Sequence, residues 1–151
     1  MLKALRRLAA FCLCISLSLG LGLITPANVN AADLKPADLA VIRRQAAAYE
    51  ATKARLPELA RLVSAEDWTF TRNLIHGPMQ EVGREMLYIN QRLDRSQRKD
   101  ADKIARNLKE ALADLDEAAR LQDSSRLQRS YSAVAAGFDA YSDVIPAEAL
   151  S

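Results

Sequence analysis

Residues 97–121 decide the fold, and they read QRKDADKIARNLKEALADLDEAARL. Apolar residues recur in this stretch at steps of three and four, which is the spacing of one face of an α-helix. The apolar positions are Ala101, Ile104, Leu108, Ala111, Leu112, Leu115, Ala118 and Ala119. Because the residues between them are mostly charged or polar, the stretch predicts a long helix with one buried face.

Three further stretches have apolar residues at the same spacing, at residues 37–63, 66–93 and 124–144. Proline interrupts two of them, at Pro57 and at Gly77-Pro78. A proline has no N–H, and its ring opposes the carbonyl four residues back. We therefore expect a kink or a restarted helix at each proline, with a long helix beginning near Pro78.

Four amphipathic helices joined by short connections can bury their apolar faces only against one another. The sequence therefore predicts an all-α fold, an antiparallel up-down four-helix bundle over residues 32–151. Ser64 with Asp67 is expected to cap the second helix, and Ser96 the third. Residues 32–37 and 146–151 are expected to be loose ends.

Residues 1–31 have the order of an export signal. A basic start is followed by an apolar run from Leu8 to Ile24, and small residues precede an expected cleavage between Ala31 and Ala32. An uncleaved membrane anchor is the alternative, although serines and glycines dilute the run. A pair of arginines in the basic start leaves the export route open between a general and a twin-arginine signal.

Cleavage would leave 120 residues without cysteine, because Cys12 and Cys14 both lie in the apolar run. Disulfide and thiolate chemistry would then be excluded. Phe11 and Leu13 precede the cysteines where a bacterial lipoprotein has a small residue, so we do not expect a lipid anchor. Cleavage also removes three basic residues and no acidic ones, which leaves 18 Lys and Arg against 19 Asp and Glu. This balance gives no indication of nucleic-acid binding.

The sequence lacks the motifs of common catalytic and cofactor sites. A ferritin-like di-iron site needs Glu-x-x-His pairs on two helices, whereas His76 is the only histidine and follows Asn73 by three residues. No glycine-rich phosphate loop is present. Asp114, Asp116 and Glu117 are expected to form a solvated helix face, with loose binding of a divalent ion together with His76 as the alternative. We therefore expect no enzymatic activity, no cofactor and no metal site.

The remaining candidates for function are surface residues of the third helix. Seven basic residues occur between Arg92 and Lys109, and an acidic stretch follows. This pattern is either ordinary solvated charge or an electrostatic docking patch, which salt would release. The candidate residues for docking are Arg95, Arg98, Lys99 and Lys103.

The second helix carries a second group of candidates. Trp68 either packs in the core or anchors a partner, since tryptophan is favoured at binding hot spots. Arg72, Asn73 and His76 lie within about one helical turn beside the Gly77-Pro78 break. Their side chains either cap the carbonyls that the break frees or face a partner.

Three short runs in this helix form a specific pattern: Asp67-Trp68, then Thr71-Arg72-Asn73-Leu74-Ile75-His76-Gly77-Pro78-Met79, then Val82-Gly83-Arg84-Glu85-Met86. The pattern resembles the signature region of the PsbQ family, and in particular its cyanobacterial form. A first helix with a late Leu56-Pro57 and an end with Tyr131, Phe138-Asp139 and Tyr141 are compatible with the same family.

The resemblance implies an extrinsic, non-catalytic subunit on the lumenal side of photosystem II, peripheral on the thylakoid membrane. Such a subunit covers the complex near its manganese–calcium cluster and helps it to retain calcium and chloride. Cyanobacterial members are often lipoproteins, and the residues before the two cysteines depart from that pattern. The expected partners are the lumenal face of photosystem II and its other extrinsic subunits.

The expected contact residues are Trp68, Arg72, Asn73, His76, Arg84 and Glu85, followed by Arg95, Arg98, Lys99 and Lys103. Arg84 and Glu85 could instead form internal pairs across the bundle. The alternative function is a periplasmic helical-bundle protein that binds a metal ion or a small ligand.

Overall fold

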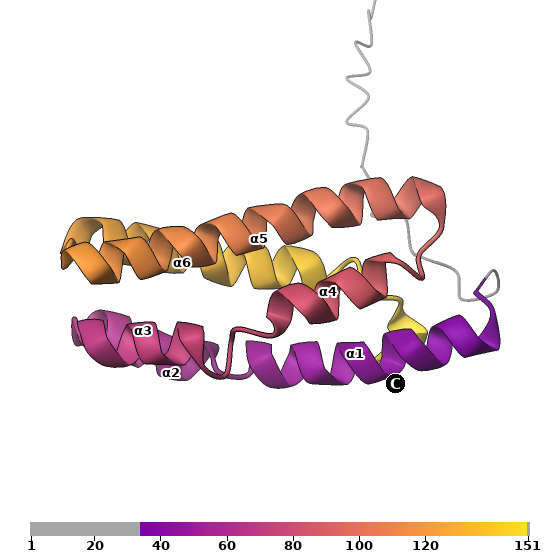
Figure 1. Ribbon diagram of the computed structural model, residues 1–151, viewed down its shortest axis with the longest axis horizontal. Helices are drawn as coiled ribbons and strands as arrows, with labels where there is room; N and C mark the ends of the chain where they lie inside the picture. The colour runs from indigo at the N-terminus through magenta and orange to yellow at the C-terminus, as the bar shows by residue number, and fades with distance from the viewer. Residues whose placement is uncertain (1–33, 151) are drawn as a thin grey trace, which may run out of the picture.

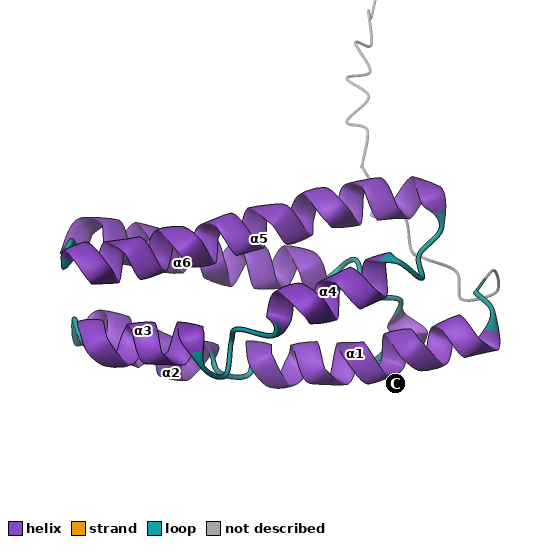
Figure 2. Ribbon diagram, in the orientation of Figure 1, coloured by secondary structure: helices purple, strands orange, loops and turns teal. Residues whose placement is uncertain are grey.

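The computed structural model describes residues 34–150 (Figure 1). These residues form six α-helices and one short 3₁₀ helix: α1 (Pro36–Lys53), α2 (Leu56–Ser64), α3 (Trp68–His76), α4 (Val82–Asn90), α5 (Arg95–Leu121), α6 (Ser124–Ser142) and η2 (Ala147–Ala149). No strand occurs in the described range, as the colouring of Figure 2 makes plain. The predicted all-α fold class is confirmed.

The first predicted helix is two helices, because the chain restarts at a proline. α1 ends at Lys53, and Pro57 lies in the first turn of α2. Proline suits that position, since the N–H groups of a first turn have no partner inside the helix. The interruption turns the chain so that α2 packs against α3 and α6, while α1 packs against α4.

The second predicted helix is broken over five residues, 77–81, rather than at a single kink. A Cβ atom on Gly77 would lie 2.8 Å from the carbonyl oxygen of Asn73, so this position requires glycine. Met79 is buried in the core after the turn. No helix begins at the proline, because residues 77–81 form a turn, and α4 starts only at Val82.

Aspartates begin three of the helices, and the serines expected as caps do not. Asp67 accepts a hydrogen bond from the backbone N–H of Phe70, and Asp94 accepts from those of Ser96 and Gln97. Asp123 does the same for α6. Ser64 is instead the last residue of α2, so its expected role in a capping box was wrong. Ser96 is the second residue of α5 and donates through its hydroxyl to Asp94.

The longest helices, α5 and α6, pack along each other through small residues. A Cβ atom on Gly137 would lie 3.1 Å from Cδ1 of Leu108, so the two backbones approach closely there. Tyr49 of α1 completes the core beside Phe138 and Tyr141 of α6, with ring centroids 5.6 and 5.1 Å away. Burial raises the pKa of the Tyr49 and Tyr141 hydroxyls well above their usual range.

Hydrogen bonds connect these buried tyrosines to other helices. The hydroxyl of Tyr49 donates to the carbonyl oxygen of Phe138 at 2.6 Å. The hydroxyl of Tyr141 lies 2.7 Å from Oδ1 of Asn90, and Nδ2 of Asn90 donates to Asp102 at 2.8 Å. One chain of polar contacts therefore joins α6, α4 and α5.

The C-terminal segment is attached to α1, contrary to the expectation of a loose end. Ile145 and Ala149 are buried, and η2 packs against α1. Arg43 donates to the carbonyl oxygen of Glu148 at 2.9 Å. The apolar side chains of this segment explain the attachment, because they cover the end of the core.

The expected export signal at residues 1–31, with Cys12 and Cys14, lies outside the described residues. Among residues 34–150, no helix combines the length and the apolar character that crossing a membrane requires.

Candidate functional site

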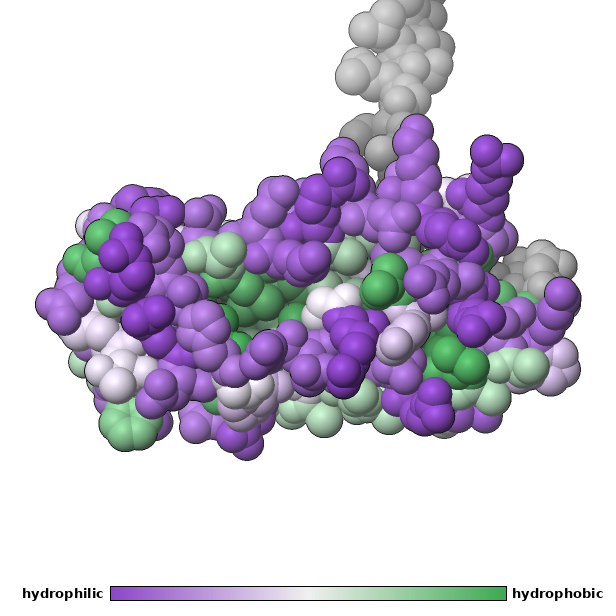
Figure 3. Space-filling view, viewed as in Figure 1, coloured by the Kyte–Doolittle hydropathy of each residue, from purple (hydrophilic) through white to green (hydrophobic). Residues whose placement is uncertain are grey.

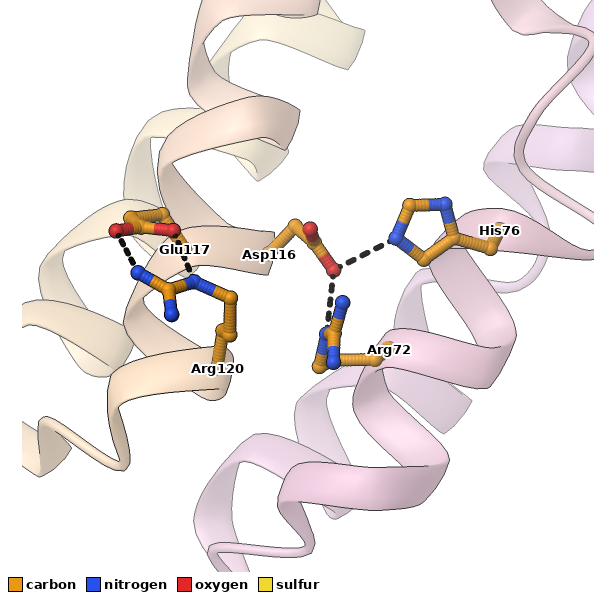
Figure 4. Close-up of polar contacts among 5 residues, drawn as sticks. All are labelled: Arg72, His76, Asp116, Glu117 and Arg120. Atoms are coloured by element: carbon orange, nitrogen blue, oxygen red, sulfur yellow. Dashed lines mark hydrogen bonds and ion pairs between the residues drawn. The ribbon is translucent and has the colours of Figure 1, made fainter.

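Two side chains of α3 converge on one carboxylate of α5 (Figure 4). Nε of Arg72 and Nε2 of His76 lie 3.0 and 2.8 Å from the same oxygen, Oδ1 of Asp116. Since a carboxylate only accepts hydrogen bonds, this geometry assigns the proton on Nε2 of His76. Arg72 and His76 are four residues apart, so one face of α3 presents both to α5.

This cluster is open to solvent on one side. The side chains of Arg72 and His76 are 40% and 60% exposed, whereas that of Asp116 is 21% exposed. The next residue of α5, Glu117, receives two hydrogen bonds from Arg120, each of 2.7 Å. The paired guanidinium of Arg120 lowers the pKa of the Glu117 carboxyl, and Glu117 in turn raises the pKa of Arg120.

A shallow pocket of about 300 Å³ lies beside the cluster, between α3 and the end of α5. It is lined by Trp68, Thr69, Arg72, Asn73, His76, Ala119, Arg120 and Gln122. Its lining is mostly polar, with the aromatic ring of Trp68 at one side. Among residues 34–150, no three His, Cys, Asp or Glu side chains come together as metal ligands would. The arrangement offers donors, one carboxylate and an aromatic surface to a partner.

Of the expected contact residues on α3, Arg72 and His76 bond to Asp116 of α5 and do not cap the carbonyls at the break. Their contact with a partner stays a prediction. Trp68 is partly buried against the core, and Asn73 is exposed. Neither of the two roles considered for Arg72 and His76 included Asp116. The sequence did contain a signal, because Asp116 follows Leu112 by four residues and precedes Ala119 by three.

Arg84 and Glu85 lie in different surroundings, since the Arg84 side chain is 64% exposed and that of Glu85 is mostly buried. Arg84 pairs with Glu81 on the same helix turn. Glu85 is only 8% exposed and lies between α4 and α1, where its carboxylate is 3.4 Å from the hydroxyl of Thr52. Burial raises the pKa of the Glu85 carboxyl. Glu85 also lines a surface hollow together with Thr52 and Arg55, so the contact of a partner with its carboxylate stays a prediction.

The basic candidates on α5 also divide into one residue with a structural role and three exposed residues. Arg98 donates to the carbonyl oxygens of Asn90, Gln91 and Leu93 at 2.8 to 3.0 Å, and so caps the end of α4. This is a structural role that the charge pattern alone did not predict. Arg95, Lys99 and Lys103 are exposed and make no ion pair within the described range.

Comparison with known proteins gives two matches. The family model of PsbQ, described as oxygen evolving enhancer protein 3, matches residues 22–146. CyanoQ of Synechocystis sp. is 28% identical over 88 residues, which are 58% of this chain and 59% of that protein. The chain therefore spans somewhat less than two thirds of the length of this curated relative.

The matched region includes all six described α-helices and the polar cluster of α3 and α5. The family match extends well beyond the signature residues from Asp67 to Met86, and it covers most of the chain. From the extent of this match, we conclude that the chain belongs to the PsbQ family.

Proposed function

We propose that this protein is a non-catalytic extrinsic subunit of photosystem II, held on the lumenal side of the thylakoid membrane. In this role it stabilises the oxygen-evolving complex and helps to retain calcium and chloride. Membership of the PsbQ family supports the proposal, because the description of that family is oxygen evolving enhancer protein 3. The similarity to CyanoQ favours a cyanobacterial setting.

The proposed mechanism is shielding by a preformed surface. The core of packed helices and buried tyrosines presents its exposed side chains in a fixed arrangement, so that docking requires little ordering of the bundle. A docked bundle would cover part of the complex and slow the escape of ions without binding them itself. Such a subunit needs no catalytic group.

We further propose that residues 32–151 form one up-down four-helix bundle. In this arrangement α1 with α2 forms one interrupted rod, and α3 with α4 forms another. The packing of α5 on α6, of α1 on α4, and of α2 on both α3 and α6 supports it.

The proposed docking residues are the exposed or partly exposed candidates that remain. On α3 they are Trp68, Arg72, Asn73 and His76, and on α4 Arg84. On α5 they are Arg95, Lys99 and Lys103. A partner with acidic and polar groups fits this set, and contacts of this kind weaken as salt rises.

Affinity purification through a C-terminal tag tests the proposal. Membranes of the source cells are solubilised gently, and the absorption spectrum and oxygen evolution of the eluate are measured. We expect a chlorophyll-containing, oxygen-evolving complex. A colourless monomer would contradict the proposal and favour the periplasmic binding protein.

A deletion strain tests the ion-retention part separately. We expect its oxygen evolution to fall in medium depleted of calcium and chloride, and to recover when either the ions or the gene are restored. Equal loss in the deletion and parent strains would contradict ion retention while leaving the assignment as a subunit intact.

A further inference from the structure

The two halves of α5 differ in how their charges are satisfied. In the second half, Asp114 pairs with Arg126, while Asp116 and Glu117 pair as described above. In the first half, five basic side chains make no ion pair and no side-chain hydrogen bond within residues 34–150: Arg95, Lys99, Lys103, Arg106 and Lys109. These cations outnumber Asp100 and Asp102, so the first half of α5 presents an excess of positive charge.

An apolar groove of about 290 Å³ lies beside two of these cations, between α4 and α5. Gly83 and Leu87 of α4 line it on one side, and Ala105, Arg106 and Lys109 of α5 line it on the other. The side chain of Leu87 is large, apolar and 50% exposed. Figure 3 shows hydrophobic surface in a hollow below α5, beside the start of α4 and the break that precedes it.

The aliphatic stem of Lys109 forms part of the groove wall. A Cβ atom on Gly83 would lie 3.5 Å from Cδ of Lys109 and 3.7 Å from its Cε, which are ordinary van der Waals distances. The absence of a side chain at Gly83 thus leaves the groove open beside this stem, while the ammonium group remains exposed. Asp102 also lines the groove, where it accepts a hydrogen bond from the neutral amide of Asn90 and keeps its negative charge. Arg106 and Lys109 outnumber it, so the charged side chains of the groove are positive in sum.

We propose that this groove binds an acidic segment of a partner protein, with one apolar side chain of the segment against Leu87 and Ala105 and its carboxylates on Arg106 and Lys109. Charge complementarity selects this occupant, because unpaired cations bordering an apolar hollow favour a segment that carries both acidic and apolar groups. The inference rests on the proposed function, and it names the chemistry of the photosystem II surface that docks there.

Reversing the charge of Arg106 and Lys109 tests their role in the groove. Photosystem II membranes washed free of extrinsic subunits are the probe, and binding is measured by pelleting at low and high salt. We expect Arg106→Glu with Lys109→Glu to weaken binding at least about tenfold at low salt. The matched control is Arg44→Glu with Arg129→Glu, which makes the same charge change at exposed residues of α1 and α6 that form no ion pair within the described range. We expect the control to change binding by less than about threefold.

Filling the hollow tests its shape. Gly83→Leu places a large apolar side chain into the groove and is expected to weaken binding by a similar factor. Gly83→Ala is the control, because its methyl group stays at contact distance from Lys109 and alanine favours helix. Thermal unfolding followed by circular dichroism verifies that each variant keeps its fold.

The outcomes separate this inference from the proposed function. If wild type binds and all groove variants bind equally well, the groove assignment is wrong and the subunit assignment stands. If wild type does not bind, both fail. Vesicles containing phosphatidylglycerol are the last probe. If wild type binds these vesicles and the charge-reversed variant does not, while both bind the washed membranes equally, the groove binds lipid. That result would overturn the inference.

Discussion

At the scale of single residues, Asp116 adds a polar connection between α5 and α3, a short helix that also packs on the core through Leu74 and Ile75. α3 has nine residues and ends at the Gly77 turn, so its own hydrogen bonds hold it weakly. Arg72 and His76 connect it to α5 through the carboxylate of Asp116. Because the two α3 side chains are substantially exposed, water and salt screen this connection.

We expect Asp116→Asn to lower the free energy of unfolding by about 0.5–1 kcal/mol, the range typical of partly exposed ion pairs. Asp114→Asn is the control, because the Asp114 side chain is 63% exposed and has one partner, Arg126. Urea unfolding at equal salt measures both. An effect of Asp116→Asn no larger than that of the control would show that the cluster contributes nothing to stability.

Glu85 should make stability depend on pH. Its pKa is raised by burial in the folded protein, so the folded state binds more protons than the unfolded state between the ordinary glutamate pKa and the raised value. The free energy of unfolding therefore falls as pH rises through that interval. We expect Glu85→Gln to flatten this decline and to gain stability relative to wild type as pH increases.

Urea unfolding over a pH series from about 4 to about 8 measures this effect. Glu58→Gln is the control, since Glu58 is exposed and pairs with Arg55 one turn away. Parallel curves for wild type and Glu85→Gln would contradict the assignment of the pH dependence to this carboxyl.

At the scale of helices, the hydrogen bonds from Tyr141 through Asn90 to Asp102 connect α6, α4 and α5. We expect Asn90→Ala to cost about 1–3 kcal/mol, because it removes two hydrogen bonds, one of them to a carboxylate. The Tyr141 hydroxyl keeps its hydrogen bond to the carbonyl oxygen of Met86 at 3.0 Å. Tyr141→Phe removes the hydroxyl while keeping the ring. A double-mutant cycle of the two substitutions measures their coupling, which we expect to exceed about 0.5 kcal/mol. Additive effects would mean that the two side chains act independently.

The helices themselves were predictable from the spacing of apolar residues, whereas the polar contacts between them were not. Glu85, Asn90 and Asp116 each lie three or four residues from apolar neighbours, at spacings that belong to the buried face. Charged and amide side chains are mostly exposed, so residue type alone favoured the surface for Asn90 and Asp116. For Glu85 an internal pair across the bundle was one of the two expectations. Their partners Thr52, Tyr141 and Arg72 lie on other helices, and periodicity within one helix cannot identify a partner on another.

The residues that cap the helices were also predicted only in part. Three aspartates, rather than the two expected serines, cap the helices, and Arg98 caps α4 from α5. The motif from Asp67 to Met86 nevertheless indicated the correct family, which the match over residues 22–146 confirms.

At the scale of the whole molecule, the last segment covers one end of the core against the first helix. We expect Ile145→Ala to lower the free energy of unfolding by about 2–4 kcal/mol, because it removes a buried side chain and leaves a cavity. Leu150→Ala is the control, since Leu150 is 48% exposed and its truncation should have a small effect. Equal effects in thermal or urea unfolding would show that the segment does not contribute to the core.

Trp68 gives this molecule a built-in optical reporter. It is the only tryptophan of the chain, and it lies half-buried at the start of α3, beside the pocket that Arg72 and Arg120 line. Its fluorescence emission wavelength therefore reports whether α3 is packed against the bundle, whereas circular dichroism averages over all helices. Detachment of α3 would appear as a red shift with little loss of ellipticity, in the unlabelled protein.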